Sequence, residues 1–195
     1  MATAEQLTFG YPDRPLLRGL NVQIPPGISL VRGDESAGKT TLLRLLAGEL
    51  APQAGSVKAP GGSSLCWVDV RDPALDPQVG RHWLQTMAHG YPLWSDEQLA
   101  GHIEAWDLEP HLHKPIYQLS TGTRRKLVMA AALASGAALT LLDEPLSGLD
   151  KPSIRHLQEA LAEVAVQAPH RAVVVAHYEA LPGVPWVQII DLPGA

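Results

Sequence analysis

A glycine-containing loop in the first quarter of the chain carries residue types that bind phosphate. Gly33, Gly38, Lys39 and Thr40 satisfy the pattern GxxxxGK[ST]. In such a loop, backbone N–H groups surround the phosphates, the lysine neutralises terminal oxygens, and the hydroxyl binds magnesium. The residues expected to contact a nucleotide are Gly33, Asp34, Glu35, Ser36, Ala37, Gly38, Lys39, Thr40 and Thr41. Thr40 is also expected to be a magnesium ligand.

A second group of chemically active residues ends an apolar run. The stretch ALTLLDE, residues 138–144, has the pattern of a buried strand that ends in two adjacent carboxylates. That placement is costly unless a cation or a proton accompanies them. We expect Asp143 to hold the magnesium shell. Glu144 is expected to orient or deprotonate the water that attacks a terminal phosphate.

The stretch QLSTGTRR, residues 118–125, has the composition of a helix start that holds an anion. Ser120 is a helix-capping residue type, and Gly122 lets a ligand approach the backbone closely. The apolar run 127–133 predicts that a buried helix follows. The chain therefore carries two potential phosphate cradles.

The segments around these motifs alternate between strand and helix. Residues 28–31 predict a short core strand before the loop, and TLLRLLAG after it predicts a buried helix closed by Gly48. The apolar runs 138–142 and 172–176 are separated by a helical pattern around 154–166. These runs predict buried parallel strands.

Two further regions complete the expected fold. Residues 17–24 and the turn that follows them predict an N-terminal antiparallel layer, and residues 65–68 predict a short strand. Residues 72–118 lose this pattern and predict an inserted helical subdomain. We therefore predict one α/β domain over residues 1–195, built around the phosphate loop.

Inside the predicted insertion, Ser95 and Gln98 have the spacing of a capping box at a helix start. Leu99, Ile103 and Trp106 would share one face of that helix. This face is expected to pack against the rest of the domain.

Composition and charge limit the range of functions. A net charge of −5 and a pI near 5.9 argue against a nucleic-acid binder with a broad basic surface. The single cysteine, Cys66, permits no internal disulfide. The start MATAEQLTFGY lacks the features of a secretory signal, so we expect a cytosolic chain. The apolar stretch 127–142 is shorter than the roughly 20 residues of a spanning helix, so a membrane role requires a partner.

The motifs between Tyr11 and Asp191, taken in order, resemble those of the ATP-binding subunits of ABC transporters. LSTGT, residues 119–123, resembles the family signature usually written LSGGQ. SGLD, residues 147–150, resembles the D-loop that follows the catalytic strand. The resemblance implies that Tyr11 stacks on adenine and that His177 contacts the terminal phosphate.

The resemblance implies a P-loop NTPase core of the RecA-like type. It also implies an ATPase that uses ATP and Mg²⁺, with His177 and Glu144 as catalytic residues. Two copies of the chain would face each other head to tail. Ser120, Gly122 and Asp150 of one copy would then close over the ATP of the other. Separate membrane-spanning subunits would be the partners, on the cytoplasmic, inner face of the cell membrane. The compact chain is similar to subunits of the haem-exporter type.

The alternative is a soluble ABC-type ATPase that acts on nucleic acid or ribosomes. Such proteins usually have duplicated cassettes, long coiled arms or basic extensions, and this sequence has none of these features. No nucleic-acid partner is expected, and the transporter interpretation is favoured.

Three parts of the sequence depart from the family pattern. Glu35 and Ser36 stand where the family commonly has asparagine and glycine, and Thr123 replaces the last signature residue. A glutamine that contacts magnesium and the membrane partner usually follows the strand at 65–68. An ungapped comparison places Asp69 there, so Asp69 is expected to join the magnesium site, and Gln78 is the alternative.

Overall fold

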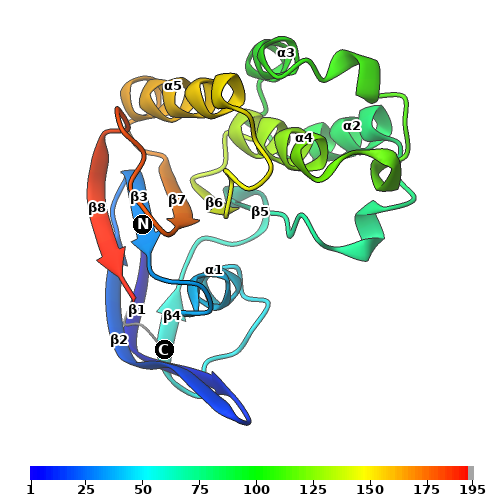
Figure 1. Cartoon of the computed structure of the whole chain (residues 1–195). Helices are drawn as coiled ribbons and strands as arrows, with labels where there is room; N and C mark the ends of the chain where they lie inside the picture. Colours follow the sequence, from blue (N-terminus) through cyan, green and yellow to red (C-terminus); the bar gives the residue numbers. More distant parts are fainter. Residues whose placement is uncertain (193–195) are drawn as a thin grey trace.

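The computed structural model describes residues 1–192 and contains two sheets with helices between and around them (Figure 1). The larger sheet is parallel, in the order β5-β6-β7-β3-β8. Its strands are β3 (Gly27–Arg32), β5 (Leu65–Trp67), β6 (Leu139–Asp143), β7 (Ala172–His177) and β8 (Trp186–Asp191). The central strands β3, β6 and β7 are near-continuous apolar runs because both faces of a parallel sheet are covered.

The smaller sheet is antiparallel, in the order β2-β1-β4, and confirms the predicted N-terminal layer. Its strands are β1 (Ala2–Tyr11), β2 (Arg14–Ile24) and β4 (Ala54–Lys58). The sequence gives no sign of β4, because Gly55 interrupts any alternation of apolar and polar residues. Gly55 has φ of 81°, and a Cβ atom there would lie 2.3 Å from the backbone oxygen of Gln6.

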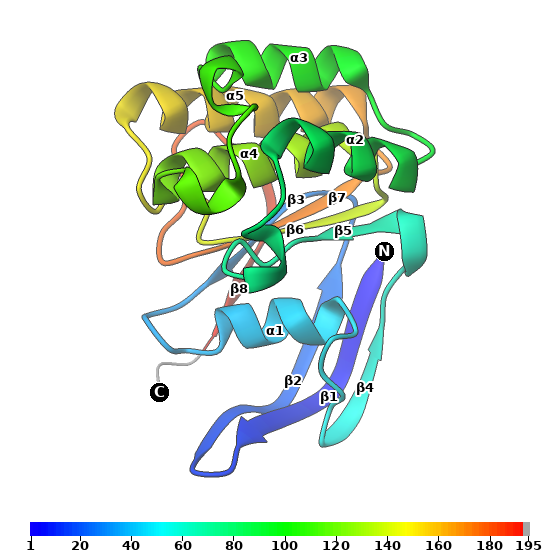
Figure 2. The same ribbon diagram turned by 90° about the vertical axis from the view of Figure 1, so that its right-hand side faces the viewer.

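Helices cover both faces of the parallel sheet (Figure 2). The helices are α1 (Lys39–Leu46), α2 (Gly80–Gly90), α3 (Asp96–Ala105), α4 (Thr121–Ala134) and α5 (Lys151–Gln167). Helix α1 lies between the two sheets, where Leu42 and Leu43 are fully buried. Gly48, with φ of 76°, follows the end of α1 and confirms the predicted stop. Helices α4 and α5 cover the other face.

Residues 72–118 contain α2, α3 and short 3₁₀ turns, and they pack on α4. Ser95 Oγ accepts a hydrogen bond from the backbone amide of Gln98 at 3.1 Å, as the capping pattern predicts. Trp83 and Trp106 are buried in the same apolar core as α4 and α5. None of the helices within residues 1–192 is long and apolar enough to cross a membrane.

Candidate nucleotide-binding site

The loop between β3 and α1 places Lys39 against the backbone of its own loop. Its Nζ donates hydrogen bonds to the carbonyl oxygens of Gly33 at 2.8 Å and Asp34 at 3.0 Å. Gly38 is the N-cap of α1 and has no side chain to cap the first N–H groups, and groups of this kind bind phosphate. Ser36 has φ of 64°, so the loop keeps a glycine-like backbone shape at the cost of some strain.

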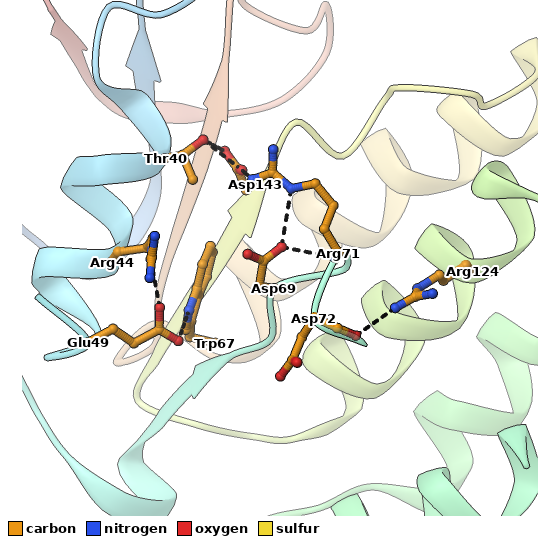
Figure 3. Close-up of polar contacts among 9 residues, drawn as sticks. All are labelled: Thr40, Arg44, Glu49, Trp67, Asp69, Arg71, Asp72, Arg124 and Asp143. Atoms are coloured by element: carbon orange, nitrogen blue, oxygen red, sulfur yellow. Dashed lines mark hydrogen bonds and ion pairs between the residues drawn. The ribbon is translucent and has the colours of Figure 1, made fainter. Parts of the chain in front are cut away.

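Thr40 and Asp143 meet where α1 begins and β6 ends (Figure 3). Thr40 Oγ1 donates to the carboxylate of Asp143, 2.8 Å from Oδ2 and 3.0 Å from Oδ1. Burial raises the pKa of Asp143 above its ordinary value, against the opposing effects of the Thr40 hydrogen bond and the Arg71 charge. A hydroxyl and a carboxylate are ligand types of magnesium, which usually adds phosphate oxygens and water.

Within the described residues, no group of three or more His, Cys, Asp or Glu side chains could hold a metal ion. Side chains of these types in residues 1–192 therefore form no complete cage for a metal. Thr40 and Asp143 would instead suit a magnesium ion whose remaining ligands would come from nucleotide phosphates and water.

Glu144 follows Asp143 and is held between two nitrogen donors. Lys39 Nζ lies 3.1 Å from Glu144 Oε1, and His177 Nδ1 lies 2.8 Å from Oε2. Burial alone would raise the pKa of Glu144, but the hydrogen bonds from His177 and Lys39 outweigh it and lower the pKa below its ordinary value. The carboxylate is therefore ionised at neutral pH, where it can orient or deprotonate a water molecule.

His177 ends β7 and is almost completely buried, with 3% of its surface exposed. While Nδ1 is bonded to Glu144, Nε2 has no hydrogen-bond partner within residues 1–192. A buried polar atom without a partner is destabilising. Nε2 is therefore a candidate for contact with a bound ligand.

A cleft of about 780 Å³ runs along the loop. The predicted residues that line it are Tyr11, Asp34, Glu35, Ser36, Gly38, Lys39, Thr40, Thr41 and Glu144. Tyr11 is 45% exposed at the end of β1, and Phe9 supports its ring edge-on with the ring centroids 5.5 Å apart. An exposed aromatic ring beside a phosphate loop can stack on a base.

Five residues that were not predicted to contact the nucleotide line the same cleft: Arg14, Leu16, Arg71, Ser147 and Tyr178. Of these, only Ser147 lies in a motif that the sequence analysis named, the SGLD turn. Arg14 pairs with Tyr11 across the turn between β1 and β2, so it could have been found as a neighbour of a predicted residue. Arg71 is different, because it contacts Asp143, which lies 72 positions further along the chain. Its only sequence signal is a cation shortly after a predicted strand.

The cleft lining lacks Gly33, Ala37 and Asp150, which were predicted as nucleotide contacts. Gly33 supplies a carbonyl that holds Lys39, and a Cβ atom on Gly33 would lie 3.0 Å from that of buried Ala37. These two residues shape the loop from inside. Asp150 caps α5 by accepting a 3.0 Å hydrogen bond from the amide of Ser153, which lowers the pKa of Asp150. Its contact with nucleotide stays a prediction.

The signature residues lie outside this cleft. Ser120 caps α4 by accepting a hydrogen bond from the amide of Thr123 at 3.1 Å, and the two hydroxyl oxygens are 2.8 Å apart. Ser120 is exposed, and neither Ser120 nor Gly122 lines the cleft. A Cβ atom on Gly122 would lie 2.3 Å from the carbonyl oxygen of Gly148, so the start of α4 packs tightly on the SGLD turn.

Neither candidate for the missing glutamine lines the cleft. Asp69 Oδ1 accepts hydrogen bonds from the backbone amide of Arg71 at 2.9 Å and from its Nε at 3.3 Å. Gln78 donates its side-chain amide to the carbonyl oxygen of Ala74 at 3.0 Å. The charge of Asp69 contributes to the raised pKa of Asp143, but its ligation of magnesium stays a prediction.

Comparison with known proteins identifies the family of the chain. A profile of the family described as ABC transporter matches residues 17–147. The cytochrome c biogenesis ATP-binding export protein CcmA of Novosphingobium aromaticivorans is 38% identical over 171 residues, which cover 87% of this chain and 84% of CcmA. The energy-dependent translational throttle protein EttA of Mycobacterium tuberculosis is 32% identical over 183 residues, covering 89% of this chain but 31% of EttA.

A solved ABC transporter ATP-binding protein from Pyrococcus furiosus has a TM-score of 0.74 to this chain at 22% identity, and the match covers 98% of this chain and 96% of that protein. This likeness supports the fold. The profile match includes the phosphate loop, the signature and the carboxylates that end β6. The chain belongs to the ABC transporter family, as an ATP-binding subunit that hydrolyses ATP.

Proposed function

We propose that Glu144 and His177 are the catalytic pair of this ATPase and that Lys39 holds the terminal phosphate of ATP. The observation that carries this assignment is the approach of Lys39 and His177 to opposite oxygens of Glu144, at 3.1 and 2.8 Å. The ionised carboxylate orients or deprotonates the attacking water. Phosphate oxygens would replace the loop carbonyls as partners of Lys39 when ATP enters.

Thr40 and Asp143 would hold the magnesium that accompanies ATP. When bound, this ion neutralises charge on the phosphate oxygens. The hydrogen bond between the two side chains keeps the hydroxyl and the carboxylate together at the end of the phosphate loop. Tyr11, which also lines the cleft, would stack on the adenine. Backbone N–H groups of the loop would bind the phosphates.

A second copy of the chain would complete the site. Ser120 is exposed at the start of α4, yet it does not line the cleft of its own chain. The N–H groups at a helix N-terminus and a hydroxyl can donate hydrogen bonds to a phosphate only when they lie within hydrogen-bonding distance of it. In a head-to-tail dimer, Ser120, Gly122 and Asp150 would approach the ATP of the partner copy. ATP would thus join the two chains, and hydrolysis would release them.

Membrane-spanning subunits would use this closing motion. CcmA is named an export protein, and by analogy we assign this chain to an exporter of the same type, docked on the cytoplasmic face of the membrane. Residues 72–118 carry three exposed large apolar side chains, and the two most exposed are Leu93 at 74% and Tyr117 at 62%. Apolar side chains of this size at a surface are candidates for a docking contact.

Purification of the tagged chain from the membranes of its native cells tests this proposal. We expect a polytopic membrane protein to co-purify and to stimulate ATP hydrolysis. The pair Leu93→Asp and Tyr117→Ala should abolish the association and leave ATP binding intact. Val166→Asp, at an equally exposed apolar position on α5, should keep it. Recovery of ribosomes in place of a membrane protein would overturn the transporter assignment in favour of the ribosomal alternative.

A further inference from the structure

Arg71 occupies the corner of the cleft where the family glutamine is missing. It follows β5 by a few residues, lines the cleft, and has 65% of its side chain exposed. Its guanidinium reaches two carboxylates: Nε lies 3.3 Å from Asp69 Oδ1, and Nη2 lies 3.4 Å from Asp143 Oδ2 (Figure 3). A cation therefore stands beside the carboxylate proposed to hold magnesium.

The chemistry of arginine excludes the role that a glutamine has at such a site. A guanidinium has donors and no acceptor, and it stays charged, so Arg71 cannot ligate a cation. Asp143 is mostly buried, with 13% of its side chain exposed, whereas Arg71 extends to the surface. Asp143 Oδ2 is within reach of both Thr40 and Arg71. A divalent cation on this carboxylate would repel Arg71, so the two cations compete for it.

The segment that carries Arg71 is also fixed at its other end. Arg124, in the first turn of α4, donates through Nη2 to the carbonyl oxygen of Asp72 at 2.8 Å and pairs with the carboxylate of Asp76. Residues 69–76 thus connect Asp143 to the helix that begins after Ser120 (Figure 3). The next residue, Asp72, is held on α4 through its carbonyl oxygen. Arg71 can therefore leave Asp143 by a movement of its long side chain, without a shift of the segment.

We propose that Arg71 is a positioning residue that holds the carboxylate of Asp143 in the nucleotide-free chain and competes with magnesium for it. Arg71 thereby sets the magnesium concentration at which the chain binds nucleotide. This inference rests on the proposed function, in which Thr40 and Asp143 bind the metal that accompanies ATP. It assigns the control of magnesium binding at Thr40 and Asp143 to Arg71, rather than to Asp69 or Gln78.

The test measures binding of a non-hydrolysable ATP analogue as magnesium is titrated, so it does not depend on turnover. Exposed ion pairs contribute up to about 1 kcal/mol, so Arg71→Ala should lower the half-saturating magnesium concentration about twofold to fivefold. Arg71→Lys keeps the charge and should stay near the parental midpoint. Arg14→Ala is the control, because it removes a different cation from the same cleft.

An unchanged or higher magnesium midpoint in Arg71→Ala would overturn the inference. So would a loss of binding at every magnesium concentration, because Arg71 would then be a direct phosphate ligand. A shift of the same size in Arg14→Ala would also overturn it, since the effect would be a general one of charge in the cleft. Failure of the parental chain to bind the analogue in saturating magnesium would instead contradict the proposed function.

Discussion

His177 Nδ1 lies 2.8 Å from Glu144 Oε2 and links the end of β7 to the residue that follows β6. These strands are neighbours in the parallel sheet, and the amide of Glu144 donates to the carbonyl oxygen of Ala176 at 2.9 Å. Ligands of parallel sheets bind at the carboxyl ends of the strands. The backbone thus fixes both side chains at that edge of the sheet. A substitution that changes only the carboxylate of Glu144 therefore tests whether this group is catalytic.

Glu144→Gln keeps the size of the side chain and removes its basicity. We expect ATP hydrolysis to fall about a hundredfold to ten-thousandfold while ATP binding persists, because loss of a general base has an effect of this size. ATP should then survive long enough to hold two chains together. Light scattering should show a dimer in ATP and much less in ADP. Hydrolysis at the parental rate would rule out Glu144 as the catalytic carboxylate.

Ser120→Arg, added to Glu144→Gln, should abolish the ATP-dependent dimer and leave ATP binding by the single chain nearly unchanged. The reason is that Ser120 is exposed and lies outside the cleft of its own chain. Ser64→Arg, at another exposed serine, is the matched control and should still dimerise. Equal loss of nucleotide binding by the monomer would contradict the separation of the two cradles.

Lys39→Ala should weaken ATP binding about tenfold to a hundredfold, because hydrogen bonds to charged groups contribute about 1.5–3 kcal/mol each. Lys39 is buried in the loop, and its ammonium group bonds to two loop carbonyls and Glu144. Nucleotide titration by calorimetry measures the change, and circular dichroism checks that the variant is folded. If the folded variant bound ATP with the affinity of the parental chain, Lys39 would not be a ligand of the phosphates.

The parts of the site that were predictable from the sequence are those whose functional residues are adjacent in the chain. Lys39 and Thr40 are adjacent in one loop, and Asp143 and Glu144 are adjacent at one strand end, so short patterns identify them. The motifs resemble a known family, which supplied the expectation for His177. The apolar runs predicted the parallel strands because complete burial requires them.

Contacts between distant residues with no motif were not predictable. Arg71 and Asp143 are 72 positions apart, and Arg124 and Asp76 are 48 positions apart. Long charged side chains pair only after the fold brings their segments together, so the sequence shows them as isolated charges. Gly55 illustrates the same limit for the backbone, because only its contact with β1 shows why β4 has a glycine there.

Gly122→Ala should destabilise the chain by about 1–3 kcal/mol, the usual cost of overpacking. The added Cβ atom would lie 2.3 Å from the carbonyl oxygen of Gly148, and backbone must shift to relieve the contact. Gly101→Ala is the control, because Gly101 lies in α3 and the added Cβ would meet no other part of the protein within 4 Å beyond its own helix backbone. It should be stabilising by up to about 1 kcal/mol. Urea unfolding of the two variants measures the difference, and equal stability would refute the tight contact.

A pair of histidines joins α3 to α5. His102 Nδ1 and His156 Nε2 lie 2.9 Å apart, so one ring must donate and the other accept, and at least one of them is neutral. Burial, followed by the charges of His156 and Arg171, lowers the pKa of His102 from 6.5 to about 4. Burial also lowers the pKa of His156, although Glu159 and Glu163 oppose this effect.

Below pH 6.5 the unfolded chain binds a proton at His102 that the folded chain excludes, so the free energy of unfolding should fall as the pH drops from 6.5 to about 4. His102→Asn keeps a polar atom near the position of Nδ1 but does not titrate. Its stability should depend less on pH across that window, even though it loses the stacking on Trp106 at every pH. Urea unfolding at several pH values measures the slopes, and His170→Asn, at an exposed position, should keep the parental slope. An unchanged slope in His102→Asn would show that the acid sensitivity arises elsewhere in the chain.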